Sequence, residues 1–122
     1  MVMSQDQLKV QTARPRIDLR SPWDGASAWA TILEDGCIQL ELCDHSEQAE
    51  ATFGNDVTWD YTIPFAEKPK LIERLAKLTG RAVVGDEAIL TSFAETFKHV
   101  HAIRDWLKQE KISFEESFDS WA

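Results

Sequence analysis

The stretch SAWATILEDGCIQLELCD, residues 27–44, contains two apolar runs separated by a short polar turn. The turn holds Asp35 and Gly36, and an Asp-Gly pair between apolar runs is the strongest short signal for a β-hairpin. In the second run, apolar residues alternate with other types from Ile38 to Cys43, which is the period of a strand with one buried face. These residues therefore predict an antiparallel strand pair whose two faces differ in polarity.

A third strand is predicted at residues 57–63, directly after the turn signal at residues 54–56. Apolar or aromatic residues alternate with polar ones along it, in the order Val57, Thr58, Trp59, Asp60, Tyr61, Thr62 and Ile63. Three successive antiparallel strands form a meander. Its apolar face must be covered, most simply by helices.

Two helical regions follow the meander. Residues 67–80, EKPKLIERLAKLTG, place Pro69 in a first turn and Gly80 as a C-terminal cap. Apolar residues recur between them at helical spacing, at Leu71, Ile72, Leu75 and Leu78. The second region starts near Asp86, a favourable N-cap, and runs to about residue 110. The pattern leaves open whether this region is one helix or two helices broken near Lys98.

The two ends of the chain complete the predicted fold. Residues 111–121, KISFEESFDSW, are compatible with a final strand that returns to the sheet, and residues 16–19 could add a short edge strand. Residues 1–15 are expected to form a flexible segment, and residues 16–122 a single domain with enough apolar residues to bury a core. The predicted fold class is α+β, a two-layer sandwich: an antiparallel β-meander of three to five strands covered on one face by two or three helices, in the order β-β-β-α-α-β.

The negative charge is concentrated in one part of the chain. The net charge is −8, yet residues 1–20 carry +2 and residues 68–122 balance nine basic against nine acidic groups. The whole deficit comes from residues 21–67, which we call the acidic region and which contain ten carboxylates and no Lys or Arg. Nucleic acid binding there is disfavoured, because phosphate contacts need cations. A basic protein partner is favoured by the same argument.

Several features favour a soluble cytoplasmic protein. The first residues lack a basic segment followed by an apolar run, and no window approaches the roughly 18 apolar residues of a membrane span. Cys37 and Cys43 lie on one predicted strand and would be about 20 Å apart. A disulfide requires Cα atoms within about 7 Å, so an internal bridge is not expected and a reducing compartment fits.

Metal and catalytic motifs are weak. Residues 43–47 include Cys43, Asp44, His45 and Glu47, but adjacent strand residues point to opposite faces and no paired-ligand spacing is present. His99 and His101 diverge by about 200° on a helix and cannot share one metal, which favours two polar-face histidines. No nucleophile motif or Gly-rich phosphate loop occurs. We therefore expect no metal, no cofactor and no enzymatic activity.

The acidic region and its aromatic residues supply the candidate binding site. Aromatic residues are favoured as interface anchors, and two of them lie in predicted loops beside the carboxylates. The predicted partner-binding residues are Trp23, Glu41, Asp44, Glu47, Glu50, Phe53, Asp56 and Asp60. The alternative interpretation is a solvated surface without a partner.

The residues FGNDVTWDYTIP (53–64), with the closing stretch WLKQEKISFEESFDSW (106–121), resemble a group of small uncharacterised bacterial proteins that share a W-D-Y-T-(V/I)-P strand. In size, charge and α+β layout the chain is also similar in type to immunity proteins of bacterial toxin systems, including those of contact-dependent growth inhibition. That resemblance implies a cytoplasmic protein that binds a cationic toxin domain, often a nuclease, and blocks it. It assigns no catalytic residue.

The leading hypothesis is thus a small non-enzymatic acidic binding protein, with toxin neutralisation as its most specific form, present as a monomer or weak homodimer. One alternative is a small-ligand or enzymatic domain with a pocket between sheet and helices, in which Asp60 or His99 meets another titratable group. Another is a structural homo-oligomer built through an edge strand.

Overall fold

The computed structural model describes residues 15–45 and 57–120 of the chain. These residues form five strands, a short 3-10 helix and three α-helices. In chain order the elements are β1 (Arg16–Leu19), β2 (Ala26–Ile32), β3 (Ile38–Asp44), β4 (Val57–Ile63), η1 (Phe65–Glu67), α3 (Lys68–Thr79), α4 (Asp86–Thr96), α5 (Val100–Gln109) and β5 (Glu115–Ser120). The predicted flexible segment, residues 1–15, lies outside the described residues except for Pro15.

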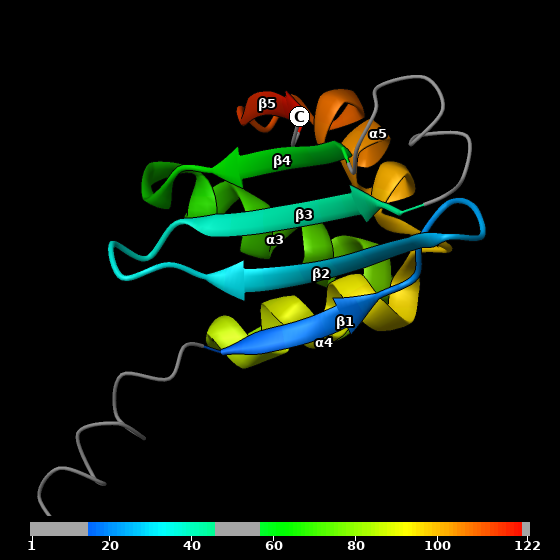
Figure 1. Ribbon diagram of the computed structural model, residues 1–122. Helices are drawn as coiled ribbons and strands as arrows, with labels where there is room; N and C mark the ends of the chain where they lie inside the picture. The colour runs from blue at the N-terminus through cyan, green and yellow to red at the C-terminus, as the bar shows by residue number, and fades with distance from the viewer. Residues whose placement is uncertain (1–14, 46–56, 121–122) are drawn as a thin grey trace, which may run out of the picture.

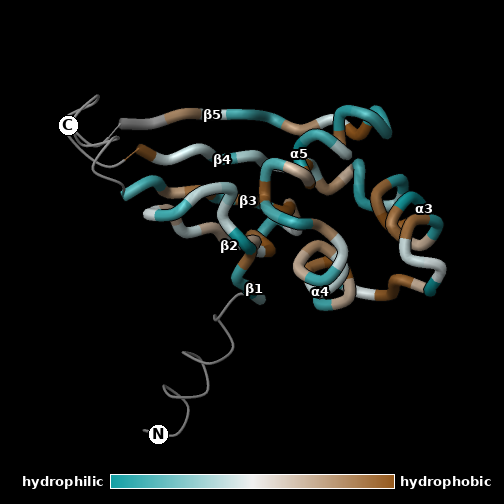
Figure 2. Tube along the Cα trace, turned by 90° about the vertical axis from the view of Figure 1, so that its right-hand side faces the viewer, coloured by the Kyte–Doolittle hydropathy of each residue, from teal (hydrophilic) through white to brown (hydrophobic). Residues whose placement is uncertain are grey.

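The five strands form one antiparallel sheet in the order β1-β2-β3-β4-β5 (Figure 1). The first four strands are a meander, and β5 returns beside β4 after the three helices. Figure 2 shows the helices on one side of the sheet, which leaves its other side open. The predicted α+β two-layer fold is therefore confirmed, including the short N-terminal strand and the returning C-terminal strand.

The turn between β2 and β3 requires glycine at its last position. The Gly36 N–H donates to the Leu33 carbonyl (2.9 Å), and the Leu33 N–H donates to the Cys37 carbonyl (2.8 Å). Gly36 has a φ of +85°, and a Cβ atom there would lie 2.6 Å from a ring carbon of Phe65. Both the left-handed backbone and the close ring exclude a larger residue.

The helices confirm most of the predicted pattern. α3 has Pro69 in its first turn and ends at Gly80, whose φ is +70°. Leu71 and Leu75 are fully buried, but Leu78, which belongs to the same helical pattern, is 47% exposed. Leu78 falls three residues after Leu75, in the last turn of the helix.

The second helical region is two helices, α4 and α5, separated by residues 97–99, so of the two alternatives the structure shows the break near Lys98. Phe97 has extended backbone, and the Nδ1 atom of His99 accepts the Ala102 N–H at 3.1 Å, which caps α5. Asp86 is the first residue of α4 rather than its N-cap, which is Gly85. The Asp86 carboxylate instead holds the Nζ atom of Lys68 at 2.7 Å and joins the starts of α3 and α4.

The core lies between the sheet and the helices. On the inner face of the sheet, the side chains of Leu40, Leu42, Tyr61 and Ile63 are fully buried. They pack in one cluster with buried residues of all three helices, among them Leu75, Phe93, Ile103 and Leu107. The core therefore uses only the inner face of the sheet. The outer face is not part of the core.

The start of β5 is tied to the helix layer. The Ser113 N–H donates to Oε1 of Glu67 at 2.7 Å, and this bond holds the pKa of the Glu67 carboxyl below its usual value. The Nζ atom of Lys70 donates to the Lys111 carbonyl at 3.1 Å. These two contacts fix where the chain enters the last strand.

Two further expectations can be compared with this fold. Cys37 and Cys43 are not bridged to each other by a disulfide. Among the helices of the described ranges, none has the length and apolar character needed to cross a bilayer.

Candidate functional site

The outer face of the sheet presents a row of cross-strand neighbours. The strand register aligns Asp18 of β1 with Trp29 of β2, Trp29 with Glu41 of β3, Glu41 with Asp60 of β4, and Asp60 with Ser117 of β5. Alternation along each strand places all five side chains on the side away from the helices. Two carboxylates that are 19 residues apart in the chain therefore become direct neighbours.

The electrostatics of this face are mainly negative. Asp18, Glu41, Asp60 and Glu115 are carboxylates at outer positions, and Arg16 is the one basic side chain among the outer positions that the structure describes. The Arg16 guanidinium lies 4.7 Å from the ring centroid of Trp29 and within 3.6 Å of the Asp18 carboxylate. The fold thus places Arg16, a cation from outside the acidic region, on the same sheet face as these carboxylates. Carboxylates still outnumber cations at the described positions of that face.

Glu41 and Asp60 form the electrostatic centre of the row. Partial burial on the sheet raises the pKa of the Glu41 carboxyl, and the neighbouring Asp60 charge raises it further. A hydrogen bond from the Trp29 side chain to Glu41 works in the opposite direction. Asp60 also accepts a long hydrogen bond from the Ser117 hydroxyl, at 3.5 Å. A cation placed over this pair would relieve a repulsion that the free protein carries.

The predicted binding residues do not all share this face. Glu41 and Asp60 lie together on it. Asp44 ends β3 on the inner side and is only 8% exposed, so it does not contribute to the outer face. The remaining predicted acids and one aromatic, Glu47, Glu50, Phe53 and Asp56, lie outside the described residues.

Trp23 belongs to a second surface, at the β5 end of the inner face. Its ring meets the ring of Trp59 edge-on at 5.9 Å, and Trp59 meets Phe118 at 5.3 Å. Trp23 is 38% and Phe118 50% exposed. We call Trp23, Trp59 and Phe118 the aromatic edge. Trp23 therefore lies on the face of the sheet opposite to Glu41 and Asp60.

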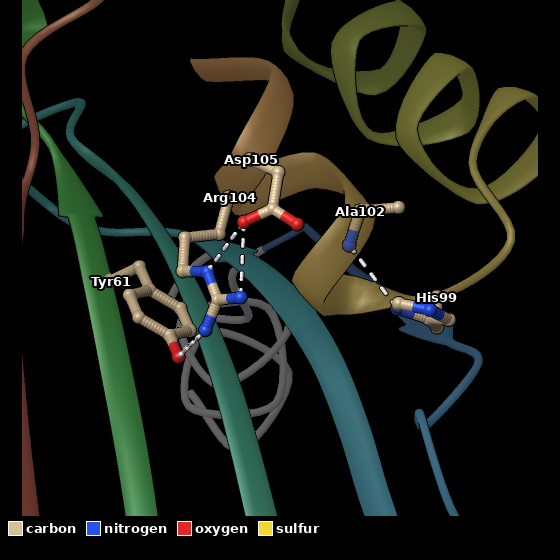
Figure 3. Close-up of polar contacts among 5 residues, drawn as sticks. All are labelled: Tyr61, His99, Ala102, Arg104 and Asp105. Carbon is tan, nitrogen blue, oxygen red and sulfur yellow. Dashed lines mark hydrogen bonds and ion pairs between the residues drawn. The ribbon is translucent and has the colours of Figure 1, made fainter. Parts of the chain in front are cut away.

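A polar cluster lies between β4 and α5, as Figure 3 shows. The Arg104 guanidinium lies between the Tyr61 hydroxyl (3.5 Å) and the Asp105 carboxylate (3.0 Å). Burial raises the pKa of the Tyr61 hydroxyl, and Arg104 opposes that rise. The sequence analysis did not predict this cluster. The three-residue spacing of His101 and Arg104 could have indicated that their side chains share one face of a helix.

His101 corrects the expectation of a polar-face histidine. Its ring packs at 5.6 Å from Trp23 and at 6.3 Å from Tyr61, and its Nε2 atom is buried without a hydrogen-bond partner among the described residues. Burial lowers the pKa of the imidazole, and the nearby Arg104 charge lowers it further. His101 thus packs against Trp23 of the aromatic edge and against Tyr61.

The alternative hypothesis of an enzymatic pocket named Asp60 and His99 as residues that would meet another titratable group. A shallow hollow of about 530 Å³ lies beside the end of α5 and the start of β5, lined by Lys108, Lys111, Ile112, Ser113, Phe114 and Glu116. Asp60 does meet a second titratable group, Glu41, but on the open face of the sheet. His99 meets His101 at 6.2 Å between ring centroids while it caps α5.

The cysteine and histidine at the end of β3 are close in space. The Cys43 Sγ atom lies 3.7 Å from Nδ1 of His45, and the Thr58 hydroxyl lies 3.8 Å from the same sulfur. Within residues 15–45 and 57–120, no group of three or more His, Cys, Asp or Glu side chains is placed to hold a metal ion.

No family model, curated protein or solved structure matches this chain. The arrangement of its own residues is therefore the basis for assigning a function.

Proposed function

We propose that this chain is a small non-enzymatic binding protein that engages a cationic protein through the outer face of its sheet. The most specific form of the proposal is a cytoplasmic immunity protein that neutralises a cationic toxin domain. The row that centres on Glu41 and Asp60 is the observation that carries it.

Three properties of the outer face support a protein partner. It is a sheet face that the helices leave uncovered, as Figure 2 shows. It holds four carboxylates against one guanidinium at described positions, a balance that attracts cations and repels nucleic acid. Trp29 lies in the middle of the row and supplies a large ring of the kind that anchors interfaces.

The raised pKa of Glu41 adds an energetic reason. The folded chain holds two carboxylates opposite each other, and like charges at directly opposed strand positions are destabilising. A basic partner that covers the pair would convert this repulsion into attraction. Steering by such a field mainly accelerates association and makes it sensitive to salt.

The proposal is tested by capture from extracts of the source cell, with this chain immobilised. We expect a basic protein to be retained at about 50 mM salt and released towards about 200 mM, because the attraction is screened. The variant Glu41→Lys/Asp60→Lys should retain none of it. The matched variant Glu73→Lys/Glu95→Lys makes the same charge change at exposed helix positions and should capture like the wild type.

Failure to retain any protein, or retention that salt does not affect, contradicts the proposal. Equal losses in the two double variants would mean that net charge, and not the outer face, governs binding. A gene for a large secreted toxin-like protein directly upstream of this one would support the immunity role specifically.

A further inference from the structure

The last strand, β5, is an edge strand of the sheet that the described residues form. It pairs with β4 on one side, and no strand in the described part of the chain pairs with its other side. In an antiparallel strand, alternate residues direct their N–H and C=O groups to opposite sides. About half of the six residues of β5 therefore direct these groups away from the sheet.

The other edge of the sheet is much less open to pairing. β1 has only four residues, follows directly after Pro15 and carries Arg16 at its start. Short length, proline and a basic side chain are the devices by which proteins blunt an edge. β5 is longer, and residues 113–118 before and within it contain neither proline nor a basic residue.

The two sides of β5 lead to two different surfaces. Phe118 pairs with Trp59 and faces the helix side, where it is half exposed within the aromatic edge. Glu115 and Ser117 face the outer side, where Ser117 lies beside Asp60. β5 is thus the line along which the aromatic edge and the acidic outer face meet.

From this geometry we infer that β5 accepts one added strand from the cationic partner, in which apolar residues alternate with Lys or Arg. Successive side chains of a strand point to opposite faces, so the apolar ones would pack beside Phe118 and the basic ones would extend over Glu115 and Asp60. This inference rests on the proposed function and specifies how the partner is held.

A second copy of β5 is the less favourable occupant. Glu115 and Glu116 are both exposed, so an edge formed by two copies of β5 would carry four carboxylates and no basic residue from positions 113–118. Charge complementarity favours a basic strand in the same place.

The probe is a short synthetic peptide of alternating lysine and valine, blocked at both ends, added to the full chain. We expect it to bind and to slow hydrogen exchange at alternate amides of β5, because those amides acquire acceptors. A second peptide has the same charge but carries methyl groups on two adjacent backbone nitrogens. Adjacent N–H groups point to opposite edges of a strand, so one of the two methyl groups blocks pairing whichever edge faces β5. The methylated peptide should bind at least about tenfold more weakly if backbone pairing holds the complex.

A protein variant tests the apolar side. Phe118→Ser should weaken binding of the unmethylated peptide severalfold, whereas Leu78→Ser, at a residue of similar exposure on α3, should leave it unchanged. Light scattering measures the mass of the chain alone and so tests whether a second copy of β5 occupies the edge. A stable dimer that Phe118→Ser dissociates would overturn the inference.

The inference is also overturned if the peptide does not bind, if β5 amides exchange at their original rate in the complex, or if backbone methylation has no effect. Salt-dependent capture of a basic protein that Glu41→Lys/Asp60→Lys abolishes would then still support the proposed function. Conversely, if no basic protein is captured but the peptide still pairs with β5, the proposed function fails while strand addition at β5 stands.

Discussion

The two faces of the sheet are built from the same strands but carry different side chains and different constraints. On the inner face, residues such as Leu40 and Ile63 are fully buried beneath three helices. On the outer face, the neighbouring residues Gln39 and Glu41 are only partly buried, and none of the three helices covers them. The contrast teaches that stability is concentrated on one face, so the other can carry unfavourable charge pairs without loss of the fold.

The largest expected effect breaks the inner face. Leu40→Ala should lower the free energy of unfolding by about 3 kcal/mol, because a fully buried side chain leaves a cavity. Gln39→Ala, one position away on the outer face, should change it by no more than about 0.5 kcal/mol. Urea denaturation of both variants measures the difference. Similar losses in the two variants would contradict the assignment of the faces.

The ion pair at the starts of α3 and α4 should have the next largest effect. The Lys68 side chain is 11% exposed and depends on Asp86 as its partner. Asp86→Ala should destabilise the protein by about 2 kcal/mol, because an almost buried ammonium loses its counter-charge. The double variant Lys68→Met/Asp86→Ala should recover much of that loss. If the single and double variants unfold at the same urea concentration, the pair contributes nothing.

A smaller effect on stability depends on pH and tests how His101 packs against the aromatic edge. Because folding lowers the pKa of His101 below 6.5, the unfolded chain binds its proton more readily. Its contribution to stability is present above pH 6.5 and is lost as the pH falls through the folded pKa. His101→Phe should lack this part of the acid destabilisation. Urea midpoints measured across this pH range would contradict the assignment if both proteins lost stability in parallel.

The smallest effect tests the outer face directly. Folding raises the pKa of Glu41 above 4.5, so its stabilising contribution is present below pH 4.5 and is lost as the pH rises through the folded pKa. At neutral pH, Glu41→Gln should therefore stabilise the protein by about 0.5 kcal/mol, by removing one of two opposed charges. The gain should vanish in acid. Thermal unfolding at both pH values measures it, and destabilisation at neutral pH would show that the pair is not repulsive.

Most of the fold could be predicted, because the periods of strands and helices are local properties of the chain. The Asp-Gly hairpin, the strand at residues 57–63 and the cap at Gly80 all follow from short patterns. The fate of Leu78 could not be predicted in this way. Its spacing is helical, but the packing of α3 against the rest of the fold leaves it 47% exposed, and spacing alone does not specify that packing.

The candidate site could be predicted only in part. Alternation along β3 places Glu41 outside and Asp44 inside, a signal that the concentration of acids obscured. The pairing of Glu41 with Asp60, and the approach of Arg16 to Trp29, depend on strand register, which no local pattern specifies. The roles of Glu47, Glu50, Phe53 and Asp56 remain predictions.

The central claim, that the outer face binds a cationic protein, is tested most directly by hydroxyl-radical footprinting of the chain alone and with the captured partner bound. Oxidation of Trp29 should fall in the complex, while that of Leu78 and Val84, exposed apolar residues in and after α3, should not change. Protection of Leu78 and Val84 with Trp29 unchanged would place the partner on the helix layer and contradict the claim.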